Sequence, residues 1–246
     1  MTDADKNFHK HNQDFFQVIT TYQDDLLKEP ENTTHYLNII RTCIQYQRFY
    51  DALEHINLVL QLDKNCIDAY FYRGKIAFEE RNYTAALNDI KIAYKHDPKN
   101  INYTLLFAEL LQKQERYNES LTVLESFQNI TNRHYELLVL QAKNNAYLGK
   151  IDQAITQFNQ AINMNPKNDQ AAYSFALFLQ DLKEYNLAIE LLNHAISKNP
   201  NHAKYYIRRG YLYLEINEQE KAVDDYLKAV ELDPKNEDIQ VISKLI

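Results

Sequence analysis

The prolines of this chain keep a fixed spacing. They stand at Pro30, Pro98, Pro166, Pro200 and Pro234, with gaps of 68, 68, 34 and 34 residues. All of them fall on one 34-residue register, whose two unfilled positions hold Lys64 and Asn132. Prolines scattered at random would not share a register. The spacing therefore predicts an internal repeat, the sequence sign of a solenoid or a similar array.

A second pattern follows the same register. Most repeats carry a small residue, a large apolar residue and another small residue, such as Ala86, Ile90 and Ala93. Spacings of four and three place these side chains on one face of a helix. The chain has only 3 Gly and 5 Pro, which is few for the tight turns of a β-rich fold. Helix pairs joined by short loops are the predicted structure.

These positions resemble the tetratricopeptide repeat (TPR) family over about residues 33–236. One repeat matches the family signature at positions 4, 8, 11, 20, 24, 27 and 32, with Tyr206, Gly210, Tyr213, Ala222, Tyr226, Ala229 and Pro234. The resemblance implies an all-α fold, an α-solenoid whose antiparallel helix pairs form a right-handed superhelix. First helices would line its concave side. Gly149 falls at position 15, where this family often turns between helices.

The register also divides the chain. We expect a polar, disordered tail at 1–12, a partial-repeat helix at 13–32, six repeats at 33–66, 67–100, 101–134, 135–168, 169–202 and 203–236, and the start of a capping helix at 237–246. No segment rich in Pro, Gly or Ser separates the repeats, so one solenoid domain is expected. The last segment is apolar on one side. It either packs on the last repeat or allows self-association with another chain.

The junction between the third and fourth repeats is the least regular. Phe127 stands where the family usually has alanine, and Asn132 replaces proline. The fourth repeat places Gln141 and Asn145 at positions that normally face the core. Buried amides need hydrogen-bond partners. We expect these partners in a neighbouring repeat, with water or a ligand as alternatives.

The concave surface of the family uses positions 2, 5, 6, 9, 12 and 13 of the first helices. Carrying these positions over gives the candidate partner-binding residues Phe71, Tyr72, Lys75, Leu105, Leu140, Lys143, Tyr147, Tyr173, Lys204, Arg208 and Tyr211. A contiguous apolar patch rimmed by charge is typical of a partner site. The alternative, for about half of these residues, is packing against a neighbouring repeat.

The resemblance and this surface predict a non-enzymatic scaffold or adaptor that binds a peptide or amphipathic helix of a partner protein in its groove. One alternative is a bacterial envelope assembly factor of the pilotin kind. Another is a co-chaperone that binds an acidic C-terminal peptide, because Lys204 and Arg208 match part of the carboxylate clamp of one TPR class. The other clamp positions hold Val139, Lys143 and Ser174, which do not match.

The sequence lacks the residues that other classes of function require. The net charge is −7 and no block of five like charges occurs, which argues against a nucleic-acid partner. No metal-ligand motif, glycine-rich phosphate loop or nucleophile motif occurs, so no catalytic residue, metal or cofactor is predicted. The carboxylates Asp89, Asp224 and Asp225 fall on predicted second helices, where a solvated face is the ordinary interpretation.

The two cysteines and the apolar content bear on the compartment. Cys43 and Cys66 have no CxxC spacing, and two cysteines are too few for a disulfide framework. We expect both to be reduced. No apolar run is long enough to span a membrane. The cytoplasm is the expected location, or the periplasm if a signal peptide has been removed.

Overall fold

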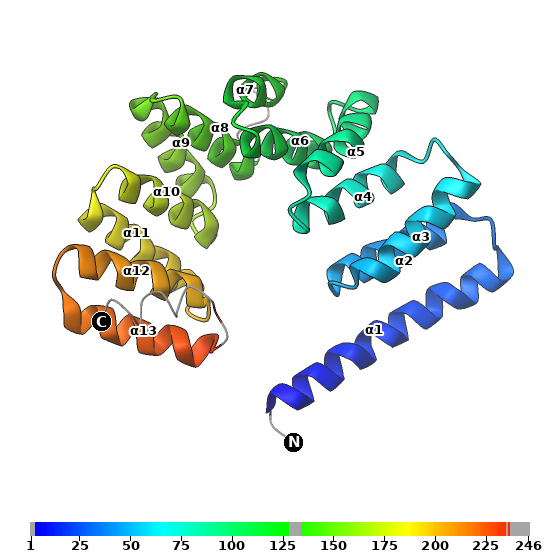
Figure 1. Cartoon of the computed structure of the whole chain (residues 1–246), viewed down its shortest axis with the longest axis horizontal. Helices are drawn as coiled ribbons and strands as arrows, with labels where there is room; N and C mark the ends of the chain where they lie inside the picture. Colours follow the sequence, from blue (N-terminus) through cyan, green and yellow to red (C-terminus); the bar gives the residue numbers. More distant parts are fainter. Residues whose placement is uncertain (1–2, 128–133, 235, 237–246) are drawn as a thin grey trace. The chain divides into compact units, whose positions relative to one another are not determined.

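The protein, seen in a computed structural model, is all-α throughout the residues that the structure describes (Figure 1). These are residues 3–127, 134–234 and 236, with side chains from residue 14 onward. Their helices are α1 (Asp3–Lys28), α2 (Thr33–Gln45), α3 (Phe49–Leu62), α4 (Ile67–Glu79), α5 (Tyr83–His96), α6 (Ile101–Lys113), α7 (Tyr117–Glu125), α8 (Tyr135–Tyr147), α9 (Ile151–Met164), α10 (Asp169–Asp181), α11 (Tyr185–Lys198), α12 (Ala203–Glu215) and α13 (Gln219–Leu232). From α2 onward, each predicted repeat supplies a first and a second helix that pack on each other. The fold is an α-solenoid, as predicted.

The chain forms two compact units. Unit 1 is Met1–Ser126 and unit 2 is Phe127–Ile246. Their boundary falls at the junction that the sequence marks as irregular. There α7 has only 9 residues, whereas α3 and α5 each have 14. Phe127 therefore lies beyond the end of α7, although it is buried at 5% exposure.

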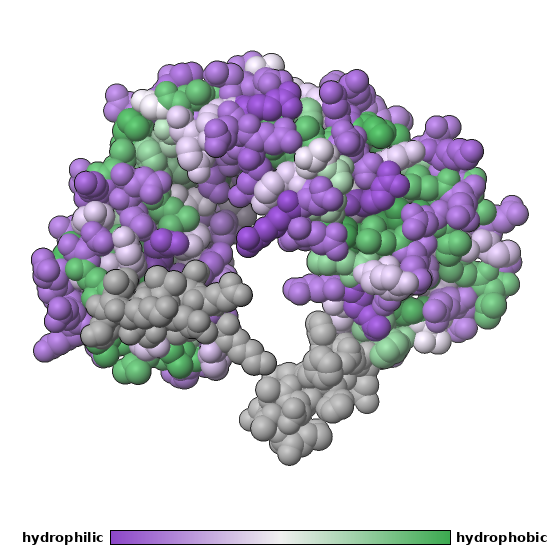
Figure 2. Space-filling view, in the orientation of Figure 1, coloured by the Kyte–Doolittle hydropathy of each residue, from purple (hydrophilic) through white to green (hydrophobic). Residues whose placement is uncertain are grey.

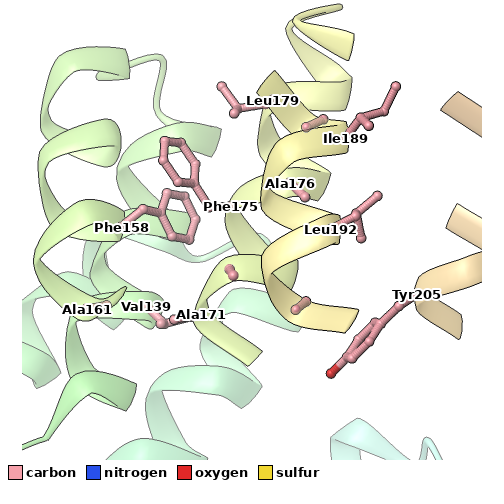
Figure 3. Packing of buried hydrophobic residues seen from close by; sticks show 14 of the residues in the cluster. Val139, Phe158, Ala161, Ala171, Phe175, Ala176, Leu179, Ile189, Leu192 and Tyr205 are labelled. Carbon is pink, nitrogen blue, oxygen red and sulfur yellow. The ribbon is translucent and has the colours of Figure 1, made fainter. Parts of the chain in front are cut away.

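The small–large–small pattern forms the core of each repeat. Ala86, Ile90 and Ala93 of α5 are completely buried, and their equivalents in α9 and α11 are buried to the same degree. In unit 2, the ring of Phe158 on α9 stacks on Phe175 of α10, with centroids 4.9 Å apart and planes 11° from parallel (Figure 3). Figure 2 shows hydrophilic residues over much of the drawn face of each unit, with smaller hydrophobic areas between them.

A hydrogen bond joins four of the first helices to the preceding repeat. In each case the hydroxyl at position 4 donates to the backbone carbonyl at position 32, over 2.9 to 3.1 Å. The pairs are Tyr36–Pro30, Tyr70–Lys64, Thr104–Pro98 and Tyr206–Pro200. Position 32 of the repeat therefore supplies a hydrogen-bond acceptor. Lys64 can replace proline there because only the backbone carbonyl accepts the bond.

Each repeat turns between its helices through a residue in the left-handed region. Gly149 at position 15 has a φ of 73°. The equivalent residues of the other repeats have φ values from 57° to 62°, and they are Gln47, Arg81, Glu115, Lys183 and Asn217. In every turn the N–H at position 16 donates to the carbonyl at position 11, over 2.8 to 2.9 Å. This bond closes the first helix as a Schellman motif does.

Helix α1 begins earlier in the chain than we expected. Its first residue is Asp3, whereas we expected a disordered tail over 1–12. No proline or glycine precedes Pro30, so nothing in the sequence breaks the helix before that point. Further along, Phe15 and Ile19 are buried in the core of unit 1. The predicted capping helix at 237–246 lies outside the described residues.

No helix in the described part of the chain combines the length and the apolar character needed to cross a bilayer.

Candidate functional site

The first helices of consecutive repeats lie against one another inside each unit. In unit 1, α2 contacts α4 and α4 contacts α6, and in unit 2 α8 contacts α10. Residues at the same repeat positions on these helices therefore come close together. We call the surface formed by positions 2, 5, 6, 9, 12 and 13 the first-helix face of each unit.

In unit 1, aromatic rings of α4 and α6 form a cluster, and an arginine of α2 bonds to one of them. The ring of Phe71 on α4 lies 4.9 Å from that of Tyr103 on α6 and 5.4 Å from that of Tyr72. The Tyr103 hydroxyl donates to Asp68 over 2.8 Å. The Tyr72 hydroxyl accepts from Nε of Arg41 on α2, over 2.5 Å. Phe71 and Tyr72 are half-buried, so part of each ring is open to a ligand.

The phenol of Tyr103 is held in its neutral form. Burial raises its pKa, and the hydrogen bond to Asp68 raises it further because an ionised phenolate would face a carboxylate.

The other two candidate partner-binding residues of unit 1, Lys75 on α4 and Leu105 on α6, are half-buried, as Phe71 and Tyr72 are. Lys75 follows Phe71 by one helical turn and lies on the same side of α4.

In unit 2, tyrosine rings support the ammonium group of Lys204. Tyr173 of α10 and Tyr205 of α12 have ring centroids 5.1 Å apart. Lys204 Nζ lies 4.7 Å from the first centroid and 5.4 Å from the second. Burial lowers the pKa of Lys204, while the nearby charge of Asp169 opposes that shift. Burial also raises the pKa of Tyr205, which hydrogen-bonds to Asp169.

Arg208 and Tyr211 extend this surface along α12. Arg208 follows Lys204 by one turn and is half-buried. Its Nε atom is inaccessible to solvent and has no acceptor among the described residues. A hydrogen bond to Glu215 raises the pKa of the half-buried Tyr211. Lys204 thus lies beside Tyr173, and Arg208 and Tyr211 follow it on α12. That these residues contact a partner stays a prediction.

The candidates on α8 are placed less favourably. Leu140 is only 7% exposed, so it offers little surface to a partner. Helix α8 is buried at six consecutive residues, Leu137 to Ala142, and not along one stripe. Lys143 is half-buried, and Tyr147 is 62% exposed at the end of the helix. Of these three residues, Lys143 and Tyr147 remain open to a ligand.

One of the two amides singled out in the fourth repeat, Asn145, bonds differently from our expectation. Asn145 of α8 is buried, and its Nδ2 donates to Oε1 of Gln157 on α9 over 2.8 Å. Both helices belong to the same repeat, so the bond lies within the repeat and not between repeats. Its role is structural, because it satisfies a buried amide.

Two carboxylates that we expected to be solvated are buried. Asp89 is bonded by Arg73 and Asp225 by Arg209, each through two hydrogen bonds of 2.6 to 2.8 Å. Asp225 is 4% exposed and Asp89 is 8% exposed. They belong to the scaffold and not to a binding surface. Among the described residues, no group of three His, Cys, Asp or Glu side chains could hold a metal ion.

Sequence reasoning missed two buried tyrosines that pack beneath the candidate surface, Tyr103 at 7% and Tyr205 at 1% exposure. Tyr103 and Tyr205 both occupy position 3 of their repeats, outside the positions that we carried over. Each packs on the aromatic residue at position 5 of the preceding repeat, Phe71 or Tyr173. Each also bonds an acidic residue at the start of that repeat. Their shared position was the one sign in the sequence that could have revealed them.

Comparison with protein families agrees with this geometry. Two models described as "Tetratricopeptide repeat" match residues 147–209 and 203–236. The model described as "Anaphase-promoting complex, cyclosome, subunit 3" matches residues 45–127. The chain is a tetratricopeptide repeat protein. These matches do not single out a subfamily.

Curated relatives of this TPR protein include proteins with different names. The "DnaJ homolog subfamily C member 7 homolog" of Dictyostelium discoideum is 26% identical over 205 residues, covering 81% of this chain and 34% of the relative. The "BBSome complex member BBS4 homolog" of Drosophila melanogaster is 28% identical over 178 residues, covering 68% of this chain and 36% of the relative. The chain thus spans about a third of the length of either relative.

Solved structures share the fold. A tetratricopeptide repeat protein from Parabacteroides merdae matches with a TM-score of 0.79 at 18% identity, over 99% of this TPR chain and 96% of that one. A chain of the APC/C hetero-tetramer Cut9–Hcn1 matches with a TM-score of 0.75 at 15% identity, over 93% of this chain and 45% of that one. At such identities the likeness concerns the fold alone.

Proposed function

We propose that this TPR protein is a non-enzymatic interaction scaffold that binds a peptide or helical segment of a partner protein on its first-helix faces. One observation carries the proposal. Half-buried aromatic residues lie on these faces in both units, Phe71 and Tyr72 in unit 1 and Tyr173 and Tyr211 in unit 2. Their rings combine a large contact area with few rotatable bonds. Such residues supply much of the affinity of protein interfaces.

The polar groups on the same faces favour a ligand with its own polar side chains. Lys75, Lys143, Lys204 and Arg208 are all half-buried beside or between the aromatic residues. Cations arranged in this way set the register and orientation of a bound segment more than its total affinity. A partner helix with one apolar side and flanking acidic residues meets both requirements.

A co-chaperone role is less well supported than general partner binding. A DnaJ homolog is among the relatives, and Lys204 and Arg208 are both on the accessible face. However, Val139 and Ser174, at two other clamp positions, are only 6% and 3% exposed. Buried side chains there cannot hold a terminal carboxylate.

The experiment is affinity capture from an extract of the source organism, with partners identified by mass spectrometry and then purified. The double variant Tyr72→Ala/Tyr211→Ala should lose the partner while its circular dichroism spectrum stays unchanged. The matched control is Leu187→Ala/Leu227→Ala, which removes exposed apolar side chains from the second helices α11 and α13. A partner that is retained by the first variant and lost by the control would contradict binding on the first-helix faces.

A further inference from the structure

Helix α3 carries an apolar row on the side that faces away from the core. Tyr50, Leu58 and Leu62 are 74%, 42% and 47% exposed. Together with the exposed Glu54 they are spaced four residues apart, and side chains at that spacing are neighbours on a helix surface. We call these four residues the α3 row. The small–large–small face of the same helix, with Ile56 at its centre, is completely buried.

This row is unlike the outer sides of the later second helices. In the described chain, α5, α11 and α13 each expose one large apolar residue, and α7 and α9 expose none. Position 18, where Tyr50 stands, is polar in every later repeat, with Thr84, Asn118, Asp152, Asn186 and Glu220. One exposed apolar side chain needs no explanation. Three on one side of a helix are typical of a partner site.

Helix α1 also exposes three large apolar residues, yet they do not form a row. Val18 lies two residues after Phe16 and nine before Leu27. At 3.6 residues per turn, these spacings place Val18 on the opposite side of the helix from the other two. Among the described second helices, α3 is therefore the one whose exposed apolar residues are aligned.

The row contains one acidic side chain that has no ion-pair partner among the described residues. Asp51 of α3 pairs with Arg48 over 2.8 Å, whereas none of the ion pairs found in the described chain includes Glu54. Helix α3 itself has no lysine or arginine. The Tyr50 hydroxyl is hydrogen-bonded to Glu54, which keeps the carboxylate within the row. The row therefore offers two apolar contacts with an anion between them.

We propose that the α3 row is a second docking surface, which binds an amphipathic helix of a partner chain through two apolar side chains and a lysine or arginine between them. One apolar side chain contacts Tyr50 and the other contacts the two leucines, while the cation pairs with Glu54. Rows of side chains four apart on two helices interlock at a crossing angle of about 50°. This inference goes beyond the proposed function, because the row lies on a second helix and not on a first-helix face.

A second copy of this chain does not meet the same requirements. If α3 packed on the α3 of a copy in a two-fold arrangement, each Glu54 would face a helix that has no cation to offer. Covering a carboxylate without a counter-charge is unfavourable. A partner helix with a cation at the matching place removes this penalty.

The test uses the 15N-labelled full chain and an alanine-rich helical peptide in which leucine, lysine and leucine stand four residues apart. NMR titration should move the amide signals of α3 and give a dissociation constant. A twin peptide with glutamate in place of lysine should bind at least about fivefold more weakly, because like charges then meet at Glu54. Leu58→Ser should weaken the lysine peptide by about tenfold through the loss of apolar contact.

A reversal of charge on the protein gives the sharpest result. Glu54→Lys should invert the preference, so that the glutamate twin binds at least about fivefold more tightly than the lysine peptide. The matched control is Glu190→Lys, at the same repeat position on α11, where Glu190 is also exposed. It should leave both dissociation constants unchanged, as should Tyr72→Ala on the first-helix face of unit 1. Circular dichroism should be the same for all variants.

Four outcomes would overturn the proposal. The first is equal affinity for the two peptides, or no binding of the lysine peptide at low salt. The second is an unchanged preference in Glu54→Lys. The third is a concentration-dependent dimer, seen by sedimentation, that Leu58→Ser dissociates, because it would assign the row to a second copy. The fourth is binding that appears only after removal of residues 237–246, which would assign the row to that segment of the chain.

These outcomes are separate from the test of the proposed function. A natural partner that depends on Tyr72 and Tyr211 but not on Glu54 or Leu58 binds on the first-helix faces. If the peptides also fail to distinguish the natural protein from Glu54→Lys, the proposed function stands and this inference alone is rejected.

Discussion

Arg209 donates two hydrogen bonds to Asp225, from Nε over 2.8 Å and from Nη2 over 2.6 Å. Arg73 and Asp89 form the same pair in the second repeat. Each pair connects position 7 of a first helix to position 23 of the second helix in the same repeat. The Asp225 side chain is 5% exposed and that of Arg209 is 18% exposed, so water screens this pair little. Burial raises the pKa of Asp225, while the guanidinium opposes that shift.

Breaking this pair should destabilise unit 2. We expect Asp225→Ala to lower the free energy of unfolding by about 3 kcal/mol, because Arg209 would be left buried without its acid. Asp89→Ala should cost about half as much, since the Arg73 side chain is 36% exposed. Glu119→Ala, at an exposed pair, is the control and should change little. Urea unfolding followed by circular dichroism measures all three, and equal losses would contradict the assignment.

The interhelical turns offer a stabilising substitution. Lys183 has a φ of 62°, a conformation that is unfavourable for a residue with a Cβ atom. Lys183→Gly should raise the free energy of unfolding by about 0.5–1 kcal/mol, and Gly149→Ala should lower it by about 1 kcal/mol. Glu184, the next residue, has a φ of −82°. Glu184→Gly is therefore the matched control and should give no gain in thermal denaturation. A gain from Glu184→Gly equal to that of Lys183→Gly would show that backbone geometry is not the cause.

The two glycines within first helices, Gly74 and Gly210, should differ in how well they tolerate substitution by alanine, because their neighbours pack at different distances. A Cβ added at Gly74 would lie 2.7 Å from Cδ1 of Ile90, whereas one at Gly210 would lie no closer than 3.3 Å to its neighbours. Gly74→Ala should destabilise the protein by about 1–3 kcal/mol. Gly210→Ala should have a smaller effect, because the gain in helix propensity offsets mild crowding.

The cause at Gly74 can be tested with a second substitution. Combining Gly74→Ala with Ile90→Ala removes the crowding side chain, so the two losses should sum to more than the loss of the double variant. Strict additivity in chemical denaturation would show that Ile90 is not the obstacle.

The two thiols should react at different rates. Burial raises the pKa of Cys43 to about 11, and the residue is 1% exposed. Burial also raises the pKa of Cys66, but this residue at the start of α4 is only half-buried. At pH 8 a thiol reagent should therefore label Cys66 in the folded protein and reach Cys43 only on unfolding. Labelling of Cys66→Ser and Cys43→Ser separates the two rates, and fast labelling of Cys66→Ser would contradict the burial of Cys43.

Much of the fold follows from the repeat register. Helices α2 and α12 begin at Thr33 and Ala203, the first positions of two predicted repeats. The prediction succeeds because the register combines small residues that must be buried with turns that end each helix. The short α7, which ends at Glu125, could not be predicted from the register.

The candidate site was predictable only in part. Lys204, Arg208 and Tyr211 follow one another on α12 because the repeat fixes their positions, and Lys204 lies beside Tyr173 of α10. The burial of Leu140 could not be predicted, because a helix sequence does not show how many of its sides the neighbouring helices cover. The buried aspartates were misread for another reason. Asp89 alone looks like a solvated residue, and only a comparison of repeats shows that Arg at position 7 and Asp at position 23 occur together in two of them.

The shared turn geometry has a consequence for how this protein can change. Six turns adopt one left-handed backbone, yet five of them carry a residue other than glycine. Each of those five positions is a place where a single substitution can make the fold more robust without touching a first-helix face. A variant with glycines at these turns would tolerate more destabilising changes on that surface. Selection for new ligands could therefore start from such a variant.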